Sequence, residues 1–112
     1  MEVRAVAKDT RISPRKVRLL VDMVRNKKVD EALTMLRFIP SPTARVVAKV
    51  IKSAAANAES DYQTSSSDLR IVRIFADEGP TSKRYRPRSR GRSSPILKRS
   101  SHITVIVTEQ EG

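Results

Sequence analysis

Alternating hydrophobic and polar positions in three short stretches of the chain predict strands that bury one face. Small apolar residues alternate with charged ones near the N-terminus, which predicts a strand over residues 2–8. Residues 69–76 and 102–108 are rich in β-branched side chains, which strands favour. We expect the last two strands to pair with each other as an antiparallel hairpin.

Apolar residues at helical spacing mark three further segments. Ser13-Pro14 and Ser41-Pro42 each place a cap residue before a proline, which predicts a helix start at each proline. A shorter helix between them carries Asp30-Glu31 in its first turn and ends before Pro40. The residues predicted to face inward are Val17, Leu20, Val21, Val24, Ala32, Leu33, Leu36, Ala44, Val47, Ala48, Ile51, Ala55 and Ala58.

The segment that joins the last two strands is unusual in length and in charge. It runs from Asp77 to Ser101, whereas hairpin loops usually have about two to five residues. If both strands continue outward, residues 79–97 form an extended basic β-hairpin about 30 Å long. This length exceeds the radius of gyration of about 13 Å expected for a domain of this size. Such a hairpin projects from the body and needs a partner to order it, because an isolated two-stranded ribbon is marginal in water.

Composition identifies the kind of partner. The chain has 112 residues and a formal net charge of +11, which predicts a single domain over residues 1–112 that binds a polyanion. From Gly79 to Thr108 there are eight basic residues and no acidic one.

The absence of cysteine excludes disulfides and thiolate metal sites. Neither a membrane-spanning stretch nor a signal peptide fits the pattern, so we expect an intracellular protein with no membrane span.

The sequence offers little for catalysis. His102, the one histidine, lies in a predicted strand, where a structural role is more frequent than that of a general base. The three glycines match neither a phosphate-binding loop nor a dinucleotide fingerprint. Asp77 and Glu78 are adjacent in a strand, so their side chains point to opposite faces. We therefore expect no catalytic residue, metal or cofactor, and an enzyme built around His102 stays open as an alternative.

Basic residues at the start of the first helix give a second indication of a polyanion. Arg15, Lys16 and Arg18 occupy the first turns, where the helix macrodipole favours acidic residues. A phosphate bound there would explain the placement, and a tolerated surface cluster is the alternative.

The polyanion could be RNA or DNA. A long arginine-rich ribbon suits folded RNA, whereas an arm that enters the minor groove of DNA is the alternative interpretation. With two Tyr and two Phe in all, stacking platforms are largely missing, so we expect recognition of backbone and shape.

Four ordered motifs, from about Ala5 to Val107, resemble the family of large ribosomal subunit protein twenty-two. They are Ile12-Ser13-Pro14-Arg15-Lys16-Val17-Arg18, Ser53-Ala54-Ala55-Ala56-Asn57-Ala58-Glu59, Asp77-Glu78-Gly79-Pro80 with the basic residues that follow it, and Ser101-His102-Ile103-Thr104-Val105. The resemblance implies an α+β fold in which three helices pack on a three-stranded antiparallel sheet and a long β-hairpin protrudes.

The same resemblance implies a function. It indicates a non-catalytic protein that binds large-subunit ribosomal RNA, supports subunit assembly and lines the nascent-chain exit tunnel with its hairpin tip. The other implied partners are neighbouring large-subunit proteins, including protein four, and the nascent polypeptide. The ribosome would be cytoplasmic or that of the plastid stroma. The residues expected to bind RNA are Arg11, Arg15, Lys16, Arg18, Lys83, Arg84, Arg86, Arg88, Arg90, Arg92, Lys98 and Arg99, and those expected at the tunnel tip are Arg88, Arg90, Gly91 and Arg92.

Overall fold

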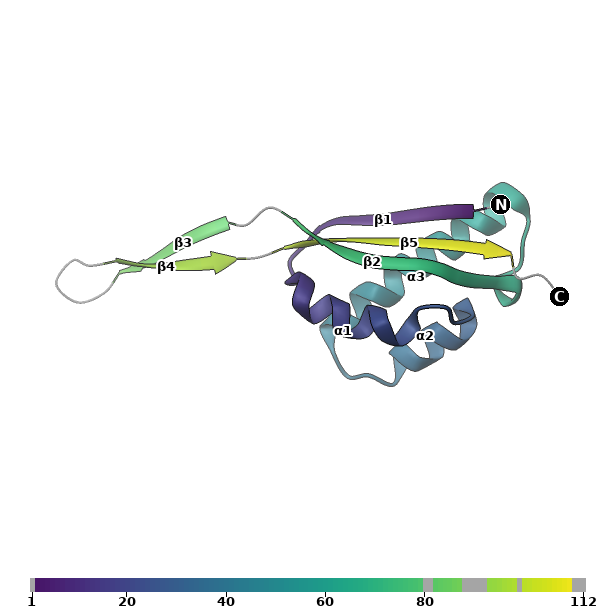
Figure 1. Ribbon diagram of the computed structural model, residues 1–112, viewed down its shortest axis with the longest axis horizontal. Coiled ribbons are helices and arrows are strands. Elements are labelled where there is room, and N and C mark those ends of the chain that lie inside the picture. Colours follow the sequence, from purple (N-terminus) through teal and green to yellow (C-terminus); the bar gives the residue numbers. More distant parts are fainter. Residues whose placement is uncertain (1, 80–81, 88–92, 99, 110–112) are drawn as a thin grey trace.

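The computed structural model describes residues 2–79, 82–87, 93–98 and 100–109. Its elements in chain order are β1 (Glu2–Thr10), α1 (Pro14–Val24), α2 (Val29–Arg37), α3 (Pro42–Tyr62), the 3₁₀ turn η1 (Ser66–Asp68), β2 (Leu69–Glu78), β3 (Ser82–Pro87), β4 (Ser93–Lys98) and β5 (Ser101–Glu109). Figure 1 shows the helices gathered on one side of β1, β5 and β2, whereas β3 and β4 lie beyond the body. The predicted α+β class is confirmed.

The body is built on a three-stranded antiparallel sheet with the order β1-β5-β2. The predicted pairing of the last two body strands is therefore confirmed, and β5 takes the central place because β1 pairs with its other edge. Two rows of cross-strand neighbours form the core face of this sheet, and all six side chains are buried. These rows are Val3, Val107 and Ile71, followed by Ala5, Val105 and Ile74.

The three helices form the second layer. α3 packs against β1 and β5, α1 packs against β2, and α2 packs mainly on α3. Because α3 contacts both the sheet and α2, its buried stripe is wider than predicted and includes Val50 and Ala54. Leu20, Leu33 and Ala48, which were predicted to face inward, are only partly buried at the margin of the core.

A loop closes the outer edge of β2 next to the end of α1. The backbone N–H of Asn26 donates to the carbonyl of Ile71 over 3.1 Å, and the N–H of Ile71 donates to the carbonyl of Lys27 over 2.9 Å. Asn26 has a φ of 65°, a left-handed conformation that asparagine adopts more readily than most residues. This turn lets the chain leave α1 along the strand edge and start α2.

The hairpin is a second, two-stranded sheet in which β3 pairs with β4. At its root, the N–H of Gly79 donates to the carbonyl of Ser100 over 2.9 Å. The molecule measures 67 × 26 × 17 Å and has a radius of gyration of 17.1 Å, compared with about 13 Å for a compact domain of this length. β3 and β4 lie beyond the body, as expected for a protruding hairpin, and β2 ends at Glu78.

Candidate nucleic-acid interface

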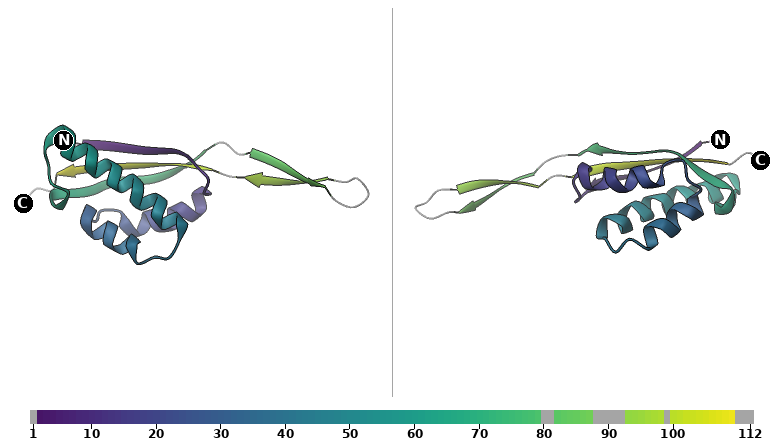
Figure 2. Two further views of the ribbon diagram at one scale, coloured as in Figure 1. Left: turned by 180° about the vertical axis from the view of Figure 1, so that it is seen from behind. Right: turned by 60° about the horizontal axis from the view of Figure 1, so that its bottom comes forward.

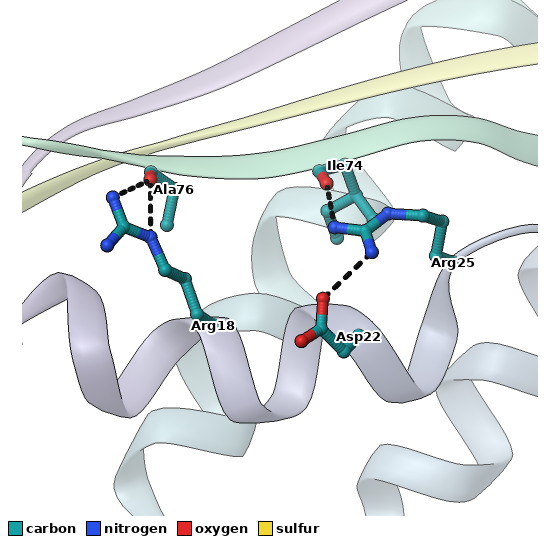
Figure 3. Close-up of polar contacts among 5 residues, drawn as sticks. All are labelled: Arg18, Asp22, Arg25, Ile74 and Ala76. Atoms are coloured by element: carbon teal, nitrogen blue, oxygen red, sulfur yellow. Dashed lines mark hydrogen bonds and ion pairs between the residues drawn. The ribbon is translucent and has the colours of Figure 1, made fainter.

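The first helix is held against the edge of β2 by arginine side chains. Arg18 donates from Nε and Nη2 to the carbonyl oxygen of Ala76, at 3.2 and 3.1 Å. Arg25 donates to the carbonyl oxygen of Ile74 over 3.2 Å and also pairs with Asp22 over 2.8 Å. Figure 3 shows these side chains reaching from α1 to the strand. The contacts fix the orientation of α1 and therefore the direction in which its N-terminus points.

The start of α1 and the turn that precedes it carry four of the residues predicted to bind RNA. Arg11, Arg15, Lys16 and Arg18 are all exposed. They lie at the end of the body from which the hairpin leaves, because Arg18 contacts Ala76 close to the hairpin root (Figure 1). Arg18 uses two of its five N–H donors on that carbonyl, so donors remain for a phosphate. The structure thus brings two separate sequence features, the helix start and the hairpin, to one end of the body.

The hairpin carries the remaining predicted residues. Lys83, Arg84 and Arg86 lie on β3, and Lys98 lies near the end of β4. In the register, Arg84 and Arg86 are opposite Ile96 and Ser94, and Lys98 is opposite Ser82. The tip residues Arg88, Arg90, Gly91 and Arg92, together with Arg99, lie outside the described residues. RNA contact by all of these residues stays a prediction.

A second basic surface was not assigned from the sequence. A groove between α2 and α3 is lined by Arg37, Arg45, Lys49 and Lys52, and its lining includes no acidic residue. Three of these cations follow one another at helical spacing along the exposed side of α3. The spacing in the sequence already indicates that these three cations share one face of a helix. Only the fold shows that Arg37 of α2 lines the same groove.

The described residues do not suggest a catalytic or metal centre. His102 is half-buried on β5, where it pairs in register with Asp77 of β2. Within the described part of the chain, no three His, Asp or Glu side chains gather in a way that could hold a metal ion. The helices described here also include none that is both long and apolar enough to span a bilayer. The charged groups that gather at the start of α1 and in the groove between α2 and α3 are guanidinium and ammonium groups.

Comparison with known proteins agrees with this arrangement. The family model of ribosomal protein L22p/L17e matches residues 5–108. The large ribosomal subunit protein uL22 of one strain of Dehalococcoides mccartyi is 66% identical over 109 residues, which cover 97% of this chain and 100% of the relative. Proteins of the same name from two other strains are 64% identical with the same coverage. The chain therefore belongs to the ribosomal protein L22p/L17e family, and it is a structural protein of the large ribosomal subunit.

Proposed function

We propose that this chain binds large-subunit ribosomal RNA through its hairpin and the adjacent start of α1, and that it supports subunit assembly in this way. The observation that carries the proposal is a ribbon that projects from the body and belongs to a stretch, Gly79 to Thr108, with eight basic residues and no acidic one. Lysine and arginine replace the counterions of RNA phosphates. One ribbon can then hold separate RNA segments close together despite their mutual repulsion.

The tip of the hairpin has a further proposed role in the exit tunnel. Arg88, Arg90, Gly91 and Arg92 would face the tunnel beside large-subunit protein four, where the nascent polypeptide passes. Support comes from the family resemblance and from the 67 Å long axis of the molecule, because an extended hairpin can reach further from the body than a compact domain could. Three curated relatives are proteins of Dehalococcoides mccartyi, which favours a cytoplasmic ribosome over that of a plastid.

Charge reversal at the tip tests the proposal. A variant with Arg88→Glu, Arg90→Glu and Arg92→Glu should no longer sediment with large subunits in a lysate gradient, whereas the wild-type chain should. Its thermal unfolding, followed by circular dichroism, should be unchanged because β3 and β4 lie beyond the body.

A matched variant controls for net charge alone. Arg45→Glu, Lys49→Glu and Lys52→Glu change the charge by the same amount on α3, and this variant should keep more of its association than the tip variant. Equal association of the tip variant and the wild-type chain would contradict the proposal. Equal affinity for duplex DNA and for ribosomal RNA at the same salt concentration would favour the minor-groove DNA reading instead.

A further inference from the structure

One face of the body sheet has no helix on it. All three helices pack on the face that carries Val105 and Ile74, and Figure 2 shows the opposite face of β1, β5 and β2 without a covering layer. A bare sheet face in a two-layer fold is normally polar, with a regular alternation of buried and solvated residues. This face departs from that expectation at its centre.

The centre of the bare face is apolar. The register places Val6 of β1, Thr104 of β5 and Phe75 of β2 in one row across the sheet. Val6 is 39% exposed and Phe75 is 38% exposed, whereas Thr104 between them is only 3% exposed. An aromatic ring therefore lies on a flat surface with more than a third of its area open to a partner.

Cations flank this row. The next row consists of Arg4, Ile106 and Arg73, with one exposed arginine on each side of the central strand. Neither guanidinium forms an ion pair or a hydrogen bond with another residue in the described part of the chain.

The remaining charged residues of this face lie further from its centre. Arg70 is one row beyond Arg73 and donates to the carbonyl of Asn26 over 3.1 Å. Glu2, opposite Thr108, lies in the row next to Arg4, and Asp77, opposite His102, lies in the row next to Phe75. Because neither carboxylate pairs with Arg4 or Arg73 in the described part of the chain, these two cations are available to an anion.

We infer that this bare face is a second RNA-contact surface, separate from the hairpin, on which an unpaired base stacks on Phe75 while Arg4 and Arg73 bind the neighbouring phosphates. The inference rests on the proposed RNA-binding function and adds a site to it. Sheet surfaces that combine exposed aromatic rings with basic residues suit single-stranded RNA, because every base has a face that can stack. An apolar protein partner fits less well, since it would bury two arginines without counter-charges.

The inference differs from one expectation drawn from the sequence. Four aromatic residues in the whole chain indicated that stacking platforms were largely missing. A platform needs only one exposed ring on a flat, basic surface, and the pairing of β1, β5 and β2 supplies that surface around Phe75. The sequence alone could not show which face of the sheet stays uncovered.

A single substitution that leaves the charge unchanged tests the inference. The full chain with Phe75→Leu should bind a single-stranded ten-nucleotide oligoadenylate about fivefold or more weakly than the wild-type chain, because a leucine cannot stack on a base as an aromatic ring does. Its affinity for an RNA duplex of the same length should not change, since paired bases are not available for stacking. Phe75→Trp should restore the affinity for oligoadenylate.

Phe38→Leu is the matched control. Phe38 is 80% exposed at the turn between α2 and α3, away from the sheet face, so its replacement should leave oligoadenylate binding unchanged. Equal losses in both variants, or an equal loss of duplex binding in Phe75→Leu, would overturn the inference.

The tip variant, with Arg88→Glu, Arg90→Glu and Arg92→Glu, is measured in parallel. If that variant loses RNA while Phe75→Leu binds as the wild-type chain does, only the sheet-face inference fails. If neither variant changes RNA binding, the proposed function fails as well.

Discussion

Arg18 and Ala76 are joined by two hydrogen bonds, from Nε and Nη2 of the guanidinium to a single carbonyl oxygen. Ala76 lies on β2, an edge strand of the body sheet, and an edge strand presents unpaired backbone groups to solvent and to other chains. Arg25 satisfies the carbonyl of Ile74 in the same way. Arg18 and Arg25 therefore close the edge of the sheet beside α1, although the charge of Arg18 alone had indicated a phosphate site.

Replacing Arg18 by Lys should lower the free energy of unfolding by about 1 kcal/mol, because an ammonium group cannot reproduce the two-pronged contact. The expected fall in melting temperature is about 4 °C for a domain of this size, measured by circular dichroism. Arg15→Lys is the control, because Arg15 is exposed on the same helix without a comparable contact among the described residues. If both variants have the same melting temperature, the Arg18 contact does not stabilise the fold.

The two Ser-Pro helix starts look alike in sequence but differ in structure. The side chain of Ser41 accepts a hydrogen bond from the N–H of Thr43 over 3.2 Å, whereas the side chain of Ser13 makes no capping hydrogen bond. Ser41→Ala should therefore cost about 1 kcal/mol of stability, and Ser13→Ala should cost less than about half of that. Urea unfolding of the two variants measures the difference, and equal losses would mean that the cap at Ser41 contributes nothing specific.

The starts and types of the elements follow from the sequence because each depends on local chemistry. Proline at a first helical position fixes the starts of α1 and α3, and β-branched runs fix β2 and β5. The hairpin follows from the length and charge of one connection. The edge contact of Arg18 and the exposure of Phe75 do not follow, because they depend on which strand lies at the edge and which sheet face is covered. Those properties arise only when segments far apart in the sequence pack together.

The space around Gly79 at the root of the hairpin leaves little room for a side chain. A Cβ added there would lie 2.6 Å from Oγ of Ser100 and 3.3 Å from the backbone carbon of the same residue. Gly79→Ala should therefore destabilise the chain by about 1 kcal/mol or more through overpacking. Combining it with Ser100→Ala removes the nearer atom and should recover part of the loss. Simple additivity of the two substitutions in thermal unfolding would show that the clash is not the cause.

Salt dependence distinguishes phosphate contacts of the hairpin from other sources of affinity. Six of the ten residues from Lys83 to Arg92 are basic. If all six contact phosphates, a plot of log affinity against log salt concentration should have a slope of about −4, at a factor of roughly 0.7 per contact with single-stranded RNA. Replacing Arg88, Arg90 and Arg92 by Gln should reduce the magnitude of this slope by about 2. Phe75→Leu should leave the slope unchanged, because stacking releases no counterions. Fluorescence anisotropy with a labelled fragment of large-subunit ribosomal RNA over a series of KCl concentrations provides the measurement. A slope near zero for the wild-type chain would show that charge neutralisation is not the basis of binding.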